Sequence, residues 1–322
     1  MVSIGINGLG RIGRLALRAI YAHHRGNIRL AAVNDRNDVG IVAELIKRDS
    51  IHGPAPFSVA AIGGNLHLDG GSVPFLRNQP FPDWRALGAQ IILECAGGGP
   101  DGNKARAMMG NVSACIISAP APNVDAILIM GVNEGDFDSE KHRVISMASC
   151  TTNCVAPILA ALHKNNGVRK ARLVSLTAYT NSQRLVDAPH GNARLARAAA
   201  LNIIPAESST QDSLDILFPW LRGRYSALAY RVPVACGSVS DLYVELDHPL
   251  ENLEGLAISG IVECLDEPLV SSDIIGNPHS AIIDLQASFI KERDVNIVAW
   301  YDNEWAYACR LIDLAYHIGS RL

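Results

Sequence analysis

The sequence Ile4-Gly5-Ile6-Asn7-Gly8-Leu9-Gly10-Arg11-Ile12-Gly13 decides the fold of the first half of the chain. Its apolar start predicts a short buried strand, and the apolar spacing of residues 15–20 predicts a helix directly after the glycines. A second strand is predicted at residues 30–33, and it leads into Asn34-Asp35. Strand, glycine-rich turn, helix, strand and acid, in this order, are typical of a βαβ unit that binds a dinucleotide.

The glycines of this turn have separate tasks. One allows the tight turn, one lets the backbone approach a pyrophosphate, and one lets the helix pack closely on the strand. The acid at the end of the second strand is expected to bind ribose hydroxyls. The residues predicted to bind the cofactor at this end are Asn7, Gly8, Gly10, Arg11, Ile12, Gly13 and Asp35.

Asp35 favours NAD over NADP, because a carboxylate repels a 2′-phosphate. Arg36 follows directly and is the opposing feature, since an arginine can accept that phosphate. An arginine at such a place is more often a solvated side chain. We therefore predict NAD as the cofactor.

Further apolar runs extend this first domain. They lie at residues 91–94, 114–117, 127–130 and 144–147, with helical or loop segments between them. This alternation predicts a parallel sheet that is covered on both faces, with ligands beyond the carboxyl ends of its strands. We place the dinucleotide-binding domain at residues 1–149.

The run Ala148-Ser149-Cys150-Thr151-Thr152-Asn153-Cys154 places Cys150 where a strand meets a predicted helix. Unpaired N–H groups and the helix dipole at such a position stabilise a thiolate, and they can hold an anion or an oxyanion. We expect Cys150 to be a nucleophile for acyl chemistry; a buried structural cysteine is the alternative. No third metal ligand is suggested near Cys150 and Cys154, so we expect no metal.

The pattern changes after Cys150. Runs at residues 173–180, 227–232 and 242–246 partly alternate, which predicts a mostly antiparallel sheet with one covered face. Residues 181–225 are expected to form a long functional loop. The chain is thus predicted to be α/β, with a Rossmann-type parallel-sheet NAD domain, an α+β catalytic or substrate domain at 150–303, and a C-terminal helix at 304–322 that packs on the NAD domain.

The bulk composition excludes several classes of function. At 322 residues, the chain is long enough for two domains. A net charge of -4 argues against nucleic-acid binding. No apolar run approaches the roughly 20 residues of a membrane span, and the start of the sequence does not have the pattern of a signal peptide. Seven scattered cysteines indicate reduced thiols, so we expect a cytoplasmic protein.

Several motifs together resemble the glyceraldehyde-3-phosphate dehydrogenase family over nearly the whole chain. They are the run from Ile6 to Arg14, the run from Ala148 to Cys154, Asn202-Ile203-Ile204-Pro205, Arg231-Val232-Pro233 and Trp300-Tyr301-Asp302-Asn303-Glu304. Erythrose-4-phosphate dehydrogenase is a close relative with the same framework, and the segment at residues 277–282 does not choose between them. The resemblance implies a glycolytic oxidoreductase that is a homotetramer.

The resemblance also implies a mechanism and a set of site residues. Cys150 attacks an aldehyde phosphate, hydride passes to NAD, and inorganic phosphate releases the acyl group from the resulting thioester. The positions that match phosphate or substrate ligands are Ser149, Thr151, Thr180, Arg194, Ser208, Ser209 and Arg231; those near the cofactor are Ser118, Asn303 and Tyr307.

One departure from the family concerns the catalytic base. The family carries a histidine in the strand after the nucleophile, and this chain has Thr177 there, in Thr177-Ala178-Tyr179-Thr180. A threonine hydroxyl is no base near neutrality, so we expect a loss of about 10²–10⁴-fold, although Thr177 could donate a hydrogen bond to an oxyanion. We do not expect His190 on the long loop to substitute, and other histidines such as His52 lie in surface-like contexts.

Two interpretations from different classes remain. The first is an NAD-dependent, phosphorylating aldehyde dehydrogenase with impaired activity. The second is an NAD-binding protein without turnover, acting as a redox sensor or an interaction partner. Cys150 and Asn153 favour the enzyme. Thr177 and the changed phosphate loop, where Ser209 replaces a glycine, favour the second interpretation.

Overall fold

The computed structural model describes residues 1–322, and the chain forms two compact units. The first consists of Met1–Ala148 with Tyr307–Leu322, and the second of Ser149–Ala306. None of the helices has the length and apolar character needed to cross a membrane.

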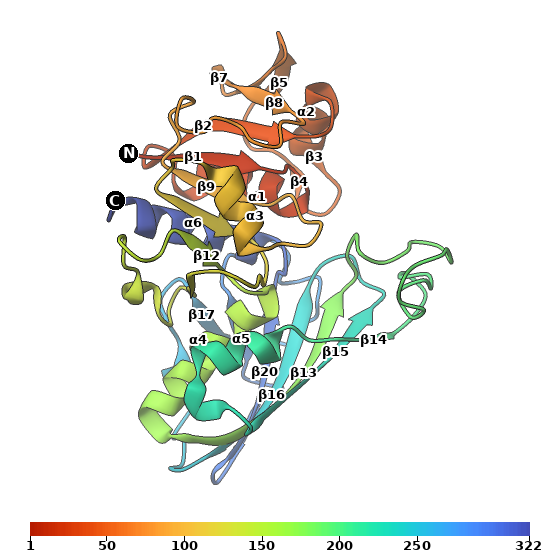
Figure 1. Cartoon of the computed structure of the whole chain (residues 1–322). Helices are drawn as coiled ribbons and strands as arrows, with labels where there is room; N and C mark the ends of the chain where they lie inside the picture. The colour runs from red at the N-terminus through yellow and green to blue at the C-terminus, as the bar shows by residue number, and fades with distance from the viewer. The chain divides into compact units, whose positions relative to one another are not determined.

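The first unit is built on a seven-stranded sheet in the order β11-β12-β10-β9-β1-β2-β8 (Figure 1). Its strands are β1 (Val2–Asn7), β2 (Ile28–Asp35), β8 (Phe75–Arg77), β9 (Ile91–Glu94), β10 (Ala114–Ile117), β11 (Ala126–Ile127) and β12 (Val144–Ser146). All neighbours pair in parallel, as predicted. The chain fills one side of β1 first and then the other, so the strand order reverses between β1 and β9, where sheets of this type bind ligands.

Helices and short strands complete the first unit. They are α1 (Arg11–His23), α2 (Val39–Lys47), α3 (Gly102–Met109), most of α6 (Trp305–Gly319), η1 (Glu134–Asp136), and the strands β3 (Arg48–Asp49), β4 (Gly53–Pro54), β5 (Val59–Ile62), β6 (Asn65–Leu68) and β7 (Gly71–Val73). Ile4, Ile6 and Ile92 on the central strands have no exposed surface. Burial on both faces explains why these strands are continuously apolar in sequence.

The strand predicted at residues 127–130 is largely wrong, because only Ala126–Ile127 pair with the sheet. Asn133 turns the chain away. Its side chain accepts a hydrogen bond from the N–H of Ile129 at 2.9 Å and donates to the carbonyl of Ile127 at 2.9 Å. These bonds replace ladder bonds, so the apolar run ends in a turn.

The second unit contains an eight-stranded sheet in the order β14-β15-β13-β16-β20-β18-β17, with β19 paired to β20. The strands are β13 (Val168–Ala178), β14 (Ile204–Ala206), β15 (Tyr225–Val232), β16 (Ser238–Leu246), β17 (Val262–Leu265), β18 (Ala281–Asp284), β19 (Phe289–Lys291) and β20 (Asp294–Tyr301). Most pairs are antiparallel, as predicted; β13 with β15 and β17 with β18 are parallel.

The helices α4 (Cys150–Asn166) and α5 (Thr210–Leu217) pack on one face of this sheet (Figure 1). The short helices η2 (Pro219–Leu221) and η3 (Glu254–Leu256) complete the unit. Residues 181–225 were predicted to be one long loop, and this is wrong after residue 203. Leu214 and Phe218 lie four residues apart and are buried, which anchors α5 in the core.

Candidate functional site

The chain turns into α4 through a tightly bonded junction. Cys150 is the first residue of the helix, and Ser149 is its N-cap: the Ser149 hydroxyl accepts a hydrogen bond from the N–H of Thr152 at 3.0 Å. The side-chain amide of Asn153 donates to the carbonyl of Ser149 at 2.9 Å. The predicted position of Cys150 at a helix N-terminus is therefore confirmed.

Ala148, just before this junction, has a backbone conformation that alanine rarely adopts. Its φ is 52°, in the left-handed region, and its side chain is fully buried. The Tyr307 hydroxyl donates to the carbonyl of Ala148 at 2.8 Å. A strained residue held in this way is common beside reacting groups. Sequence periodicity gave no signal for it.

A second helix begins at the same place. The Thr210 hydroxyl, on the first residue of α5, lies 3.4 Å from the hydroxyl of Ser149. No side chain caps α5, so the starts of two helices, each with unpaired N–H groups, come together here. This arrangement suits an anion such as phosphate. Ser208 and Ser209, predicted at the phosphate site, directly precede α5. Thr210 was not predicted, although a hydroxyl before an apolar helical run is a usual sign of a helix start.

The pKa of Cys150 corrects our expectation of a stabilised thiolate. Burial raises this pKa above the usual range of a thiol. The positive charge of Arg231 and the hydrogen bonds from Thr151 lower it, but they do not outweigh burial. The thiol is therefore protonated at neutral pH, and α4 alone does not make it a thiolate.

Thr177 lies on β13 beside Arg231 of β15, with which it is paired in register. Its side chain is buried, and its hydroxyl donates to the carbonyl of Tyr230 at 3.2 Å. The one proton of the hydroxyl is thus used by the backbone. Donation by Thr177 to an oxyanion stays a prediction, and it would require the hydroxyl to leave the Tyr230 carbonyl. The Arg231 guanidinium donates to the carbonyl of Ala178 at 3.1 Å, which holds it near Cys150.

The other predicted phosphate ligands differ in their surroundings. The Thr151 hydroxyl is buried and lies 2.8 Å from that of Tyr301, a buried side chain that sequence reasoning missed. The Thr180 hydroxyl is bonded to that of Ser182 at 2.9 Å on an exposed segment. Arg194 is also exposed.

His190 makes its hydrogen bonds within its own loop. Its Nδ1 accepts from the N–H of Asn192 at 2.9 Å. Nearby, Arg197 and Asp187 form an exposed ion pair of 3.0 Å. The loop is therefore held by local polar contacts.

The glycine-rich turn of the first unit fits a dinucleotide. Gly8 has φ 91°, and a Cβ there would lie 2.4 Å from the backbone of Ala96. A Cβ on Gly13 would lie 2.0 Å from the carbonyl oxygen of Gly8. A Cβ on Gly10 would meet nothing within 4 Å. Gly10 is the N-cap of α1, Ile12 lies in the first turn of this helix, and no side chain caps the helix. The start of α1 is thus open to a pyrophosphate.

Hydrogen bonds fix the strand ends around this turn. Asp35 accepts from the N–H of Leu9 at 2.7 Å and from the N–H of Asn37 at 2.8 Å. Asn7 donates to the carboxyl of Glu94 at 2.6 Å. The Ser118 hydroxyl donates to the Glu94 carbonyl at 3.0 Å. Burial raises the pKa of Glu94, although its bond from Asn7 opposes this.

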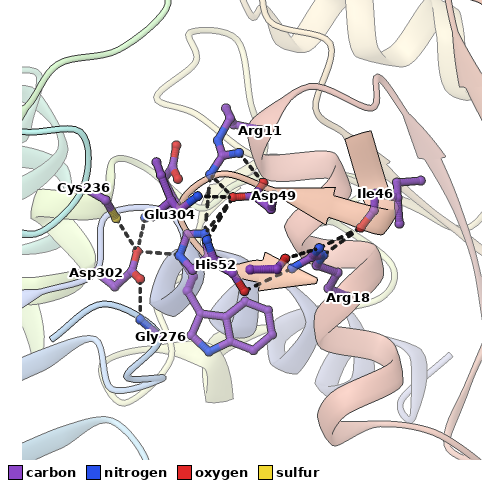
Figure 2. Close-up of polar contacts among 12 residues, drawn as sticks. Arg11, Arg18, Ile46, Asp49, His52, Cys236, Gly276, Asp302 and Glu304 are labelled. Atoms are coloured by element: carbon purple, nitrogen blue, oxygen red, sulfur yellow. Dashed lines mark hydrogen bonds and ion pairs between the residues drawn. The ribbon is translucent and has the colours of Figure 1, made fainter. Parts of the chain in front are cut away.

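Arg11 was predicted to bind the cofactor, and its side chain is paired with Asp49 (Figure 2). One of its nitrogens lies 3.2 Å from Asp49 Oδ1, and a second contacts Oδ2. A bidentate pair of this kind holds the guanidinium in place. The contribution of Arg11 to a pyrophosphate is therefore expected from its backbone N–H.

Asp49 also organises the segment that follows it (Figure 2). It accepts hydrogen bonds from the N–H groups of Ile51 and His52, each at 3.0 Å. The His52 side chain is only 6% exposed, so its predicted surface position is wrong. Arg18, also buried, donates to the carbonyls of Ile46 at 2.7 Å and Gly53 at 2.8 Å.

In the second unit, Asp302 has a similar organising role (Figure 2). Its carboxyl accepts from the N–H groups of Glu304 at 2.9 Å and Gly276 at 2.8 Å, and from the thiol of Cys236 at 3.2 Å. The next residue, Asn303, is thereby held at the end of β20. The Asn303 side chain accepts two hydrogen bonds, which are described below.

Comparison with known proteins identifies the family. Residues 2–101 match the model for the glyceraldehyde 3-phosphate dehydrogenase NAD binding domain, and residues 149–303 match the model for its C-terminal domain. Glyceraldehyde-3-phosphate dehydrogenase 2 of Streptomyces arenae is 41% identical, over 100% of this chain and 99% of the relative. Glyceraldehyde-3-phosphate dehydrogenase 2 of Bacillus subtilis is 38% identical, over 100% of this chain and 98% of the relative. The chain belongs to the glyceraldehyde-3-phosphate dehydrogenase family, and its cofactor is NAD.

The raised pKa of Cys150 predicts slow alkylation at neutral pH. The rate of reaction with iodoacetamide should rise through an inflection above the ordinary thiol value of about 8.5. Arg231→Met should move the inflection to still higher pH, because Arg231 lowers this pKa. Peptide mass spectrometry distinguishes Cys150 from the other six cysteines. Arg197→Met is the matched control on the exposed loop, and an inflection below 8.5 in the wild type would contradict the prediction.

The Asp49 cluster predicts an acid-sensitive contribution to stability. Burial alone would raise the pKa of Asp49, but hydrogen bonds from His52 and Arg11 hold it well below its usual range. Its stabilisation is therefore complete at pH 7 and declines as the pH falls below the unfolded value of about 3.9. Asp49→Asn should lower the free energy of unfolding by about 1–3 kcal/mol at pH 7.

Urea unfolding followed by circular dichroism at pH 7 and pH 3 measures this difference. We expect it to be smaller at pH 3. An equal difference at both pH values would contradict the assignment to ionised Asp49. Asp138→Asn, which removes a surface pair with Lys141, is the control.

Proposed function

We propose that this member of the family catalyses phosphorylating oxidation of glyceraldehyde 3-phosphate, or a similar aldehyde phosphate, through a thioester on Cys150, with impaired activity. Two features support the chemistry. Cys150 begins a helix, whose first N–H groups favour acyl chemistry by stabilising an oxyanion, and a second helix begins beside it. Arg231 adds a positive charge near the sulfur.

The reaction makes separate demands on these residues. The deprotonated sulfur of Cys150 forms a bond to the aldehyde carbon, and the oxygen takes up a proton to give a thiohemiacetal. When bound, NAD accepts the hydride that leaves this carbon. The hydroxyl proton must leave at the same time, so that a thioester remains. Inorganic phosphate then attacks the thioester, the carbon–sulfur bond breaks, and the sulfur leaves as a thiolate.

The anion-binding features serve the two phosphates. Ser149, Thr151 and the start of α5 offer hydroxyl and N–H donors to inorganic phosphate, and Arg231 offers its charge to the substrate phosphate. Backbone N–H groups at the start of α4 are placed to stabilise a developing oxyanion.

The single observation that supports a reduced catalytic rate is the hydrogen bond made by the Thr177 hydroxyl. Its hydroxyl donates to the Tyr230 carbonyl at 3.2 Å, and it has no basicity near neutral pH. The thiohemiacetal proton therefore lacks the base that the family resemblance places at this position. Loss of general base catalysis typically costs about 10²–10⁴-fold.

Thr177→His should therefore raise the rate of NADH formation from glyceraldehyde 3-phosphate, NAD and phosphate by about 10²–10⁴-fold, because an imidazole can accept the proton. Absorbance at the NADH band measures this directly for both proteins. Cys150→Ser in the same background should abolish the gain. A wild type within about tenfold of the variant would mean that another group supplies the base.

An NAD-binding role without turnover, as a redox sensor or an interaction partner, is the second candidate. The raised pKa of Cys150 together with Thr177 favours it, since both suppress the chemical steps more than ligand binding. Inactivity of both proteins with retained NAD binding would support it. Erythrose 4-phosphate is the alternative substrate, and the same assay tests it.

We also infer self-association into the homotetramer that the resemblance implies. The face of the second unit's sheet opposite α4 and α5 carries Leu176 and Leu228, which are 40% and 46% exposed. A cavity of about 850 Å³ lies on the sheet at Arg172 and Tyr243. Large exposed apolar side chains beside charged ones are usual in subunit interfaces.

Light scattering tests the assembly. The wild type should have four times the mass of one chain, and Leu228→Glu should lower it, because a charge would be buried in the interface. Phe81→Glu, a change of an exposed apolar residue in the first unit, is the control. A monomeric wild type would contradict the assembly. We further propose a cytoplasmic location, with no nucleic-acid or membrane partner; seven free cysteines support a reducing compartment.

A further inference from the structure

We propose that Ser238 is a positioning residue, which fixes the side-chain amide of Asn303 so that its nitrogen donates to the carboxamide oxygen of the nicotinamide. The proposal rests on NAD as the cofactor and on the resemblance that places Asn303 beside the nicotinamide. It adds a residue that acts through Asn303 and touches neither cofactor nor substrate.

The sheet brings the two residues together. Ser238 is the first residue of β16 and pairs in register with Tyr301, near the end of β20. Asn303 lies two residues beyond, just after Asp302, whose carboxyl holds the following turn. Ser238 is 1% exposed, so its hydroxyl depends on protein partners for its hydrogen bonds.

The direction of each hydrogen bond follows from which groups can only donate. The N–H of Ala178 donates to the Ser238 oxygen at 3.1 Å. The Ser238 hydroxyl then donates its own proton to Oδ1 of Asn303, at 3.1 Å. The backbone N–H of Gly237 donates to the same Oδ1 at 3.2 Å. The Gly237 N–H can only donate, so it settles which end of the Asn303 amide is oxygen, and the Ser238 hydroxyl then donates to that same oxygen.

The consequence is an amide nitrogen held at a fixed place in the second unit. With Oδ1 turned toward Gly237 and Ser238, Nδ2 of Asn303 points away from these two donors and is the end of the amide that can donate. A primary amide nitrogen that is held in this way selects an acceptor, and the carboxamide oxygen of nicotinamide is one. Fixing the rotamer in advance removes an entropy cost from binding.

The same serine connects Asn303 to the strand of the missing base. Ala178, whose N–H is bonded to Ser238, directly follows Thr177 on β13. The Ser238 oxygen therefore takes part in two hydrogen bonds, one from the backbone of β13 and one to the Asn303 side chain. The Thr177 side chain itself bonds elsewhere, to Tyr230, so this connection does not depend on the residue at the base position.

Calorimetric binding of NAD and of ADP-ribose, which lacks the nicotinamide, tests the proposal without any turnover. Ser238→Ala should weaken NAD binding by about three- to tenfold, the usual effect of one lost hydrogen bond, and leave ADP-ribose binding unchanged. In an Asn303→Ala background, Ser238→Ala should have no further effect on NAD binding, because the residue through which it acts is gone.

Ser240→Ala is the matched control. Ser240 is also buried on β16, two residues along, and pairs in register with Ala299, whereas the two donors to Asn303 Oδ1 are Gly237 and Ser238. It should leave the ratio of NAD to ADP-ribose affinity unchanged. Three outcomes would overturn the positioning role. They are an equal weakening of NAD and ADP-ribose binding by Ser238→Ala, an effect on NAD affinity that adds to that of Asn303→Ala, and an unchanged NAD affinity.

The outcomes also separate this proposal from the function proposed above. If the wild type binds NAD and ADP-ribose equally, the nicotinamide contact is absent and the role of Ser238 fails, whereas NAD binding stands. If the predicted affinity pattern is found in a wild type that forms no NADH, the role of Ser238 is supported and the dehydrogenase activity is not.

Discussion

The chemistry available to this chain depends on how a negative charge on the sulfur of Cys150 is compensated. Burial removes water from the sulfur and raises its pKa. Arg231 and Thr151 act in the opposite direction but are too weak to prevail. Arg231 is the only charged side chain that lowers this pKa, and no histidine acts on it. The start of α4 is therefore better suited to hold anions than to keep its own thiol ionised.

The two units use helix starts in different ways. In α4, the Ser149 hydroxyl already satisfies one N–H group, that of Thr152, and so it fixes the geometry of the nucleophile. In α1, Gly10 provides no cap, so the N–H groups remain for a ligand. The Arg11 guanidinium, paired with Asp49, is kept from closing that open end. The helix that begins at Cys150 is thus capped by a side chain, whereas the start of α1 keeps its N–H groups available for an anion.

Local sequence patterns predicted what depends on local rules. The parallel strands of the first unit, the tasks of Gly8 and Gly13 and the start of a helix at Cys150 follow from periodicity and from steric limits on glycine. Asn133 ended a predicted strand through side-chain bonds that periodicity does not encode. Asp49 and Tyr301 make hydrogen bonds to residues far away in the sequence. Asp49 bonds to Arg11, 38 positions away, and Tyr301 bonds to Thr151, 150 positions away. Their partners are set by the fold, so the sequence alone gave no sign of them.

The hydrogen bond of the Thr177 hydroxyl shows how the fold accommodates a threonine at this position. A buried hydroxyl needs a partner, and the carbonyl of Tyr230 on the neighbouring strand β15 provides one for Thr177. The fold thus accommodates threonine at this position, and a threonine hydroxyl is no proton acceptor near neutral pH. The side chains proposed to bind ligands, Arg231 and Asn303, are held by hydrogen bonds that do not involve the side chain of residue 177. Binding and chemistry are thus carried by separable groups. Since an interaction that is equal in ground and transition states does not raise the rate of the chemical step, retained binding is no sign of retained turnover.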